Sequence, residues 1–253
     1  MRGVDLVEYL HFYRATWHGG TYDANAHRFG YVSVPVGSQI LHAVGYAMGA
    51  KLDGTGGAAL TYFGDGASSQ GDVHEAMNFA GVYRLPVVFF CQNNGWAISL
   101  PTGGQVAGGS VAARAAGYGI EGLRVDGNDV TAVFEATWAA LERGRVGGGP
   151  TVIEAMTYRL GPHSTSDDPS RYRSAEEERL RAEQDPITRA MRSVSAEEIA
   201  DAEEHAADVV RKTTAGLHAM QSPPADELFS FVYREPTTAL LDQHRAWKES
   251  QDA

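Results

Sequence analysis

Two stretches of this sequence decide the fold: Tyr62-Phe63-Gly64-Asp65-Gly66-Ala67-Ser68-Ser69-Gln70-Gly71-Asp72 and Cys91-Gln92-Asn93-Asn94-Gly95-Trp96. Each begins where a short apolar or aromatic run ends, Ala59 to Phe63 or Pro86 to Cys91, and such runs bounded by Gly or Pro are typical of buried parallel strands. Because parallel strands share one carboxyl edge of the sheet, both turns are predicted to lie where open α/β sheets bind ligands.

Further strands and helices alternate on either side of these stretches. Strands are expected at Leu123 to Val125 and Thr151 to Tyr158, and helices at Gln39 to Ala50, Val73 to Tyr83 and Val130 to Arg143. This alternation predicts an α/β fold: a doubly wound, mostly parallel sheet with helices on both faces.

The last third of the chain is expected to be helical. Helix-start signals occur at Ser174-Ala175-Glu176-Glu177, Asp185-Pro186 and Ser195-Ala196-Glu197-Glu198. From Ile199 onward apolar residues recur at three- and four-residue steps until Pro223-Pro224, which predicts an amphipathic helix. We therefore expect an α/β domain over residues 1–170 and a helical C-terminal extension, residues 171–253, packed on the same domain.

The composition excludes several classes of protein. The 253 residues carry a net charge of −11, which argues against a nucleic-acid partner. The longest apolar run, Leu85 to Cys91, is too short to cross a membrane, and the first residues lack the pattern of a signal peptide. The single cysteine, Cys91, is interpreted as a buried strand thiol. A cytoplasmic protein is expected.

The residues after the two strands suit a diphosphate with a divalent cation. Asp65 and Asn94 offer hard oxygen ligands, and Gly66 lets the backbone approach a phosphate closely. Taken alone, each stretch is more simply a turn. Together, on successive strands with 26 residues between Gly66 and Asn93, they favour a Mg²⁺ site.

Gly-Asp-Gly followed at this interval by Asn-Asn resembles the signature of thiamine-diphosphate enzymes. More closely, the chain resembles the alpha subunit of the decarboxylating component of 2-oxo acid dehydrogenase complexes, most like the branched-chain type and next like the pyruvate type. The resemblance runs from about Arg2 to the C-terminal segment. Its most specific motifs are Val34-Pro35-Val36-Gly37-Ser38-Gln39, the Gly64-to-Trp96 region, Val125-Asp126-Gly127-Asn128-Asp129, and Glu154-Ala155-Met156-Thr157-Tyr158-Arg159 leading into His163-Ser164-Thr165-Ser166-Asp167-Asp168.

The resemblance implies a thiamine-diphosphate-binding fold and a role for each matching position. Asp65, the Asn94 side chain and the Trp96 backbone carbonyl would hold Mg²⁺. The remaining cofactor contacts would come from Gly66 and Ala67 through their backbone, Val36 against the thiazolium ring, Gln92, and His163. Ser33, Pro35, Ser38 and Gln39 match a loop that binds potassium in animal relatives, although the same residues are also an ordinary cap and turn.

His163 follows Gly161-Pro162 in a polar loop, where a histidine is commonly just solvated. The match to the family's loop changes the prediction to a catalytic residue that reaches the diphosphate and faces the active-site channel. Ser164 falls where animal relatives are phosphorylated, but a plain loop serine is the simpler interpretation. Asp167 and Asp168 are expected to order the loop.

Two departures from the family pattern stand out. Gln92 lies where animal branched-chain members place an arginine against the diphosphate, so charge assistance is lost there. The family's alpha chains also carry a long segment ahead of the position that matches Met1, including a Tyr-Arg pair that grips the diphosphate. Either the chain is truncated or another polypeptide supplies that segment.

The resemblance implies thiamine-diphosphate-dependent oxidative decarboxylation of a small 2-oxo acid, with transfer of the acyl group to a lipoyl domain. The family places the glutamate that activates the cofactor on a beta subunit, so this chain should act only in an alpha-two beta-two heterotetramer docked on a lipoyl acyltransferase core. Pyruvate is the alternative substrate, and a non-catalytic assembly partner is the alternative role. No nucleophile elbow or P-loop supports a hydrolase or a nucleotide-binding module.

Overall fold

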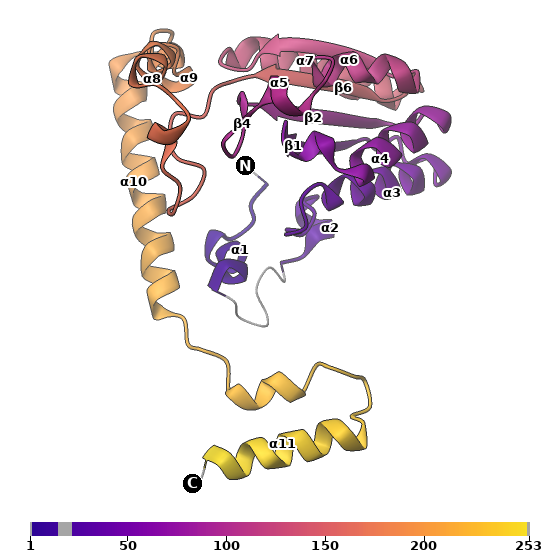
Figure 1. The fold of residues 1–253 in the computed structure, drawn as a ribbon, viewed down its shortest axis with the longest axis vertical. Helices are drawn as coiled ribbons and strands as arrows, with labels where there is room; N and C mark the ends of the chain where they lie inside the picture. Colours follow the sequence, from indigo (N-terminus) through magenta and orange to yellow (C-terminus); the bar gives the residue numbers. More distant parts are fainter. Residues whose placement is uncertain (1, 15–21, 252–253) are drawn as a thin grey trace. The chain divides into compact units, whose positions relative to one another are not determined.

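The computed structural model describes residues 2–14 and 22–251 of the chain. The chain forms two compact units, one of Ser33–Ile199 and one of Met1–Val32 with Ala200–Ala253. The first contains the sheet and every residue singled out above as a site candidate. Figure 1 traces its strands and helices along the sequence.

The sheet of the first unit has four parallel strands in the order β1-β2-β6-β5. Their bounds are Ala59–Gly64 for β1, Val87–Asn93 for β2, Glu121–Asp126 for β5 and Thr151–Met156 for β6. All four predicted strands are therefore confirmed, the last ending two residues earlier than expected. The carboxyl ends of β1 and β2 are neighbours because Gly64 pairs with Gln92.

Helices cover both faces of this sheet, as predicted. Helices α3 (Ser38–Leu52) and α4 (Gly71–Val82) run side by side along one face (Figure 1), while α7 (Val130–Arg145) packs on β2, β5 and β6. Right-handed crossovers explain the two sides. The connection from β1 to β2 through α4 and the one from β5 to β6 through α7 advance in opposite directions across the sheet, so their helices lie on opposite faces.

Alternate residues of the strands supply two hydrophobic clusters. Phe89 and Val152 face α3 and α4, whereas Phe90 and Ile153 face α7. These central strands are buried on both sides, which is why they read as unbroken apolar runs. One charged residue interrupts them: Glu154 of β6, on the α3 and α4 side and fully buried.

The connections of the first unit carry several short elements that the sequence did not suggest. They are η2 (Ala67–Ser69), β3 (Trp96–Ala97), β4 (Leu100–Pro101), α5 (Thr102–Gln105), α6 (Val111–Arg114), η3 (Ala115–Tyr118) and η4 (Pro169–Arg171). β3 and β4 form a small antiparallel pair directly after β2.

The first unit continues beyond residue 170, where the α/β domain was expected to end. It includes α8 (Ala175–Ala182) and α9 (Pro186–Met191), which begin at the predicted caps Ser174 and Asp185. Polar contacts tie both helices to the end of β5 and to the loops that follow β5 and β6. Arg173, just before α8, is buried and donates to the Gly161 carbonyl, and Arg189 of α9 forms ion pairs at 2.6 Å with Asp126 and Asp129.

The second unit is helical. Its elements are α1 (Leu6–His11), η1 (Phe12–Arg14), α2 (Ala24–His27), η5 (Ala225–Phe229), α11 (Thr238–Gln251) and most of α10 (Ala196–Ala219). The predicted capping box of α10 is present, since Ser195 Oγ accepts from the Glu198 amide while Glu198 accepts from the Ser195 amide. Among the described residues, no helix is both long enough and apolar enough to cross a bilayer.

A glycine substitution tests the packing of α6 on the sheet. A Cβ at Gly122 of β5 would lie 2.2 Å from the Ala112 carbonyl oxygen, a backbone atom that cannot yield easily. We expect Gly122→Ala to lower the free energy of unfolding by about 1–3 kcal/mol. The measurement is urea unfolding followed by circular dichroism.

Gly49 of α3 is the matched control, because a Cβ there meets nothing within 4 Å. Gly49→Ala should raise the free energy of unfolding by about 0.5–1 kcal/mol through helix propensity. Equal effects of the two substitutions would contradict the close approach of α6 to β5.

Candidate functional site

Asp65 and Asn93 lie at the carboxyl ends of β1 and β2, and both are buried. The Thr102 hydroxyl stands between them, 2.6 Å from Asp65 Oδ2 and 3.0 Å from Asn93 Oδ1. Gln105 Nε2 donates to the same Asp65 oxygen at 3.1 Å. Asp65 Oδ1 takes no hydrogen bond from the part of the chain that the structure describes. The carboxylate is thus held from one side, with one oxygen left for a ligand.

The predicted ligands Asn94 and Trp96 lie in the turn that follows β2. Asn94 Oδ1 accepts from the Trp96 amide at 3.1 Å, and the Trp96 carbonyl accepts from Arg159 at 3.4 Å. An amide oxygen and a carbonyl oxygen each have a second lone pair, so both remain able to ligate a cation. We name Asp65, Asn93, Asn94, Trp96, Thr102 and Gln105 the strand-edge cluster.

In the turn after Asp65, two backbone amides have no hydrogen-bond partner among the residues that the structure describes. The amides of Ser68, Ser69 and Gln70 donate to the carbonyls of residues 65, 66 and 67 in the short helix η2. The two amides before them, those of Gly66 and Ala67, precede the first such bond and are available to an anion. Gly66 also allows close packing, since a Cβ there would lie only 3.0 Å from the Ala97 Cβ.

These features fit a diphosphate with Mg²⁺. The buried carboxylate, the amide oxygen and the backbone carbonyl are hard ligands of the kind that Mg²⁺ takes, and Mg²⁺ usually completes its shell with phosphate oxygens and water. The described residues contain no group of three or more His, Cys, Asp and Glu side chains that could hold a metal ion, so a cation here would also need amide, carbonyl, phosphate or water oxygens. The oxygens at this edge instead suit a cation site with a single carboxylate ligand, that of Asp65.

The residues of the predicted potassium loop are close together. Ser33 Oγ is 2.6 Å from Ser38 Oγ, and Ser38 Oγ donates to the Pro35 carbonyl at 2.8 Å. Gln39 Nε2 donates to the Tyr62 carbonyl at 2.8 Å, which ties the start of α3 to β1. Val36, the predicted thiazolium contact, is exposed at the tip of this loop.

His163 lies in an exposed loop after β6. Its backbone amide donates to Asp167 Oδ2 at 2.8 Å, and the Tyr172 hydroxyl donates to the same oxygen at 2.5 Å. The hydrogen bond from Tyr172 and that from His163 hold the pKa of Asp167 below its usual value. Asp167 therefore orders the loop, as the sequence suggested. No hydrogen bond within the described residues joins His163 to the strand-edge cluster.

Gln92 and Cys91 lie outside the strand-edge cluster. Gln92 is exposed, and by strand alternation its side chain lies on the α7 side of the sheet, opposite to Asn93. Cys91 is buried, and burial, followed by the neighbouring Glu154 and Asp65 charges, raises the pKa of its thiol. The interpretation of Cys91 as a buried strand thiol is confirmed.

Glu154 is a residue of this edge that sequence reasoning missed. Its Oε1 accepts from Asn93 Nδ2 at 2.7 Å, while Oε2 accepts from Ser110 Oγ at 2.5 Å and from the Ala112 amide at 3.1 Å. Burial alone would raise its pKa, but these hydrogen bonds outweigh burial and leave the pKa below its usual value. The sequence did contain a signal for this role, because Glu154 is the single charged residue in the apolar run 151–156. A charge buried in a strand requires hydrogen-bond partners.

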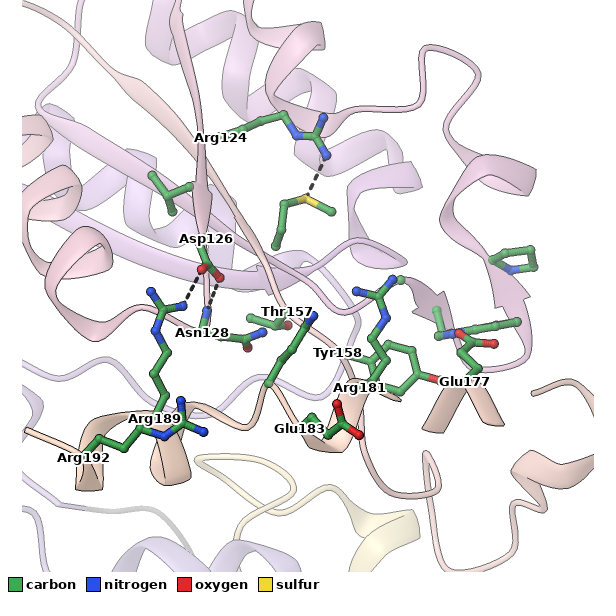
Figure 2. A pocket seen from close by; sticks show the side chains of 16 residues that line it. Arg124, Asp126, Asn128, Thr157, Tyr158, Glu177, Arg181, Glu183, Arg189 and Arg192 are labelled. Carbon is green, nitrogen blue, oxygen red and sulfur yellow. Dashed lines mark hydrogen bonds and ion pairs between the residues drawn. The ribbon is translucent and has the colours of Figure 1, made fainter. Parts of the chain in front are cut away.

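An arginine-lined cavity of about 870 Å³ lies beside the cluster, at the carboxyl ends of β5 and β6 (Figure 2). It borders the strand-edge cluster through Gly95 and Trp96 but does not include Asp65. Figure 2 shows Arg189 directed at Asp126, whose pKa is lowered chiefly by that hydrogen bond. Arg181 lies over the Tyr158 ring at 5.4 Å. Much of the positive charge of this cavity is therefore already engaged.

The family model described as "Dehydrogenase E1 component" matches residues 13–221. The 3-methyl-2-oxobutanoate dehydrogenase subunit alpha of Mycobacterium tuberculosis (strain ATCC 25618 / H37Rv) is 53% identical over 177 residues, covering 70% of this chain and 48% of that protein. The mitochondrial 2-oxoisovalerate dehydrogenase subunit alpha of Homo sapiens is 41% identical over 232 residues, covering 89% and 52%.

The pyruvate dehydrogenase E1 component subunit alpha of Staphylococcus epidermidis is 35% identical over 257 residues, covering 98% of this chain and 69% of that protein. The chain spans about half the length of the two branched-chain relatives.

The lowered pKa of Glu154 predicts how acid destabilises the protein. A carboxyl whose folded-state pKa is depressed stabilises the fold above its unfolded-state pKa, about 4.3 for glutamate, and this stabilisation is lost as the pH falls through the folded value. Glu154→Gln should therefore cost about 1–3 kcal/mol of unfolding free energy near pH 7. The difference from the unmodified chain should shrink as the pH falls below the unfolded-state pKa.

Urea unfolding from neutral pH down to about pH 3 measures this difference across the titration range. Glu121→Gln is the control, since Glu121 is partly exposed and its ion pair with Arg143 lies outside this edge of the sheet. A loss of stability in Glu154→Gln that stays constant across the range would contradict the depressed pKa.

Proposed function

Because the chain belongs to the dehydrogenase E1 component family, we propose that it is the alpha subunit of a branched-chain 2-oxo acid dehydrogenase. The proposed reaction is thiamine-diphosphate-dependent oxidative decarboxylation of 3-methyl-2-oxobutanoate or a similar acid, with transfer of the acyl group to a lipoyl domain. The observation that carries the proposal is the buried Asp65 carboxylate beside the free amides of Gly66 and Ala67. The 53% identical relative from Mycobacterium tuberculosis, by its name, supports the branched-chain substrate.

Mg²⁺ is proposed to bind the Asp65 carboxylate, the Asn94 side-chain oxygen and the Trp96 carbonyl. The diphosphate is proposed to bind the amides of Gly66 and Ala67. When bound, thiamine diphosphate supplies the electron sink that decarboxylation of a 2-oxo acid requires. The protein's part is to bind and orient it.

The chain's own residues prepare this edge before any ligand arrives. Thr102 and Gln105 hold Asp65 Oδ2, so the carboxylate does not need to reorganise when the cation binds. The unpaired amides at the start of η2 add positive potential where the diphosphate would lie. Arg159, which bonds the Trp96 and Ile98 carbonyls, braces the turn that carries the other two ligands.

Further contacts are proposed for the loops around this edge. Val36 would lie against the thiazolium ring, and His163 would reach the diphosphate and face the channel by which substrate enters. Gln92 is exposed on the α7 side of the sheet, so it would have to reach around the carboxyl end of β2 to contribute a neutral hydrogen bond to the diphosphate. The oxygens of Ser33, Pro35 and Ser38, with the Gln39 amide, form the proposed potassium loop.

Catalysis is proposed to require a beta subunit, in an alpha-two beta-two heterotetramer that docks on a lipoyl acyltransferase core. Proton transfer to and from the cofactor needs a carboxyl group that can change its charge. Glu154, the buried glutamate near the cluster, accepts hydrogen bonds at both oxygens and has a lowered pKa, so it is unsuited to that task. This supports placing the acid–base group on the partner.

Pyruvate is the second candidate substrate. The observation that favours it is the relative from Staphylococcus epidermidis, named a pyruvate dehydrogenase subunit, whose similarity covers 98% of this chain. Its identity is 35%, against 53% for the branched-chain relative over a shorter span. The chain co-purified with its beta subunit should therefore turn over 3-methyl-2-oxobutanoate faster than pyruvate, with an artificial electron acceptor as the readout.

That turnover should depend on both Mg²⁺ and thiamine diphosphate. Preference for pyruvate would reassign the substrate. No turnover with either acid, from a complex that assembles properly, would favour a non-catalytic assembly partner.

Removal of the Asp65 carboxylate tests the site itself. Asp65→Ala in the assembled complex should abolish Mg²⁺-dependent binding of thiamine diphosphate, measured by isothermal titration calorimetry, because the hard anionic ligand is lost. Asp53→Ala is the matched control: Asp53 lies at the exposed end of α3 and should leave binding unchanged. Retained Mg²⁺-dependent binding in Asp65→Ala would refute the site assignment.

A further inference from the structure

Glu154 is a fully buried carboxylate, and none of the proposed cofactor contacts uses it. A buried charge is destabilising unless every part of it is hydrogen-bonded, so an apolar side chain would be the simpler choice in the middle of β6. Each of its two oxygens begins a chain of hydrogen bonds, and both chains end at Asp65.

The first chain runs through the turn after β2. Glu154 Oε1 accepts from Asn93 Nδ2 at 2.7 Å, which sets the orientation of the Asn93 amide. Asn93 Oδ1 then accepts from the Gly95 amide at 3.0 Å, within the turn that carries Asn94, and lies 3.0 Å from Thr102 Oγ1. Thr102 in turn donates to Asp65 Oδ2 at 2.6 Å.

The second chain runs through α6. Glu154 Oε2 accepts from Ser110 Oγ, which caps α6, and from the Ala112 amide in its first turn. Arg114, the last residue of α6, donates to the Ser68 carbonyl at 2.8 Å and to Ser68 Oγ at 3.2 Å. Ser68 Oγ donates to the Asp65 carbonyl at 2.6 Å, so the ring of contacts closes on the same residue.

We propose that Glu154 is a positioning residue for the Mg²⁺ site: it sets the spacing between Asp65 and the Asn94 turn by holding the two chains of hydrogen bonds that meet at Asp65. The role rests on the proposed function. Glu154 is not itself a proposed ligand contact and acts through Asn93 and α6. Partners behind metal ligands affect metal affinity in this way because they orient the ligands before the ion binds.

The variant Glu154→Gln tests this role with little change in volume. The new amide cannot satisfy both sides, because its NH₂ group must face either the Asn93 NH₂ or the Ala112 N–H, and each of these is a donor. The Mg²⁺ concentration that half-saturates thiamine-diphosphate binding should rise about 10- to 100-fold. Calorimetric titration of the assembled complex at several Mg²⁺ concentrations measures it, without any turnover.

A double variant separates positioning from folding. In Asn93→Asp with Glu154→Gln, the new amide at 154 donates to the new carboxylate at 93, and its oxygen accepts from Ser110 and Ala112. The other carboxylate oxygen still accepts from the Gly95 amide, so the hydrogen bonds that join residues 93, 95, 110, 112 and 154 are restored while Thr102 keeps its bond to Asp65. The double variant should return the Mg²⁺ requirement to within about threefold of the unmodified complex, well inside the range expected for a lost outer partner.

Thr102 provides a milder test, because it is only partly buried. Thr102→Val removes the hydroxyl that links Asn93 to Asp65 and should raise the Mg²⁺ requirement, whereas Thr102→Ser keeps the hydroxyl and should not. Glu121→Gln, on the neighbouring strand, is the matched control and should leave the requirement unchanged.

The outcomes are distinct. A raised Mg²⁺ requirement in Glu154→Gln that the double variant reverses supports the role. If Glu154→Gln does not fold, the Mg²⁺ requirements of the double variant and of Thr102→Val test the role instead. An unchanged requirement in a folded Glu154→Gln or in Thr102→Val, or a raised one in the double variant, overturns it. If the unmodified complex shows no Mg²⁺-dependent binding, the proposed function fails and this role fails with it.

Discussion

The constraint on which this structure depends is the burial of two carboxylates at one edge of a parallel sheet. Asp65 and Glu154 face the same side of the sheet and are both shielded from water. Neither charge could remain there without donors, and the donors come from α5, the start of α6 and the last residue of β2. The hydrogen bonds to the two carboxylates fix these elements in one arrangement. The ligand oxygens of the site are therefore in place before a ligand binds.

Sequence reasoning located the parts of this edge that depend on local structure. Apolar runs bounded by Gly or Pro predicted β1 and β2, and the ends of those strands placed Asp65 and Asn94 near each other because parallel strands share an edge. Gly66 was predicted to let the backbone approach a phosphate; in the structure a Cβ at this position would lie 3.0 Å from the Ala97 Cβ, so a larger side chain would also crowd β3. The roles of these residues toward a cofactor remain predictions.

The parts that sequence reasoning missed depend on tertiary packing. Thr102 and Gln105 lie in a short helix whose path is set by the β3–β4 pair, and no periodic pattern marks such a connection. Helix caps predicted that residues 171–199 form helices of an extension packed on the α/β domain, but not that Arg173 and Arg189 would make the polar contacts to the sheet unit. Glu154 is a different case. Its charge inside the apolar run 151–156 can be seen in the sequence, but no prediction was based on it.

The most direct test of this account is the position of the metal. Mn²⁺ scatters anomalously and accepts the same oxygen ligands as Mg²⁺, so crystals of the complex grown with Mn²⁺ and thiamine diphosphate would reveal it. The account predicts one anomalous peak within coordination distance of the Asp65 carboxylate, Asn94 Oδ1 and the Trp96 carbonyl. A peak in the arginine-lined cavity instead, or cofactor density with no metal beside Asp65, would contradict it.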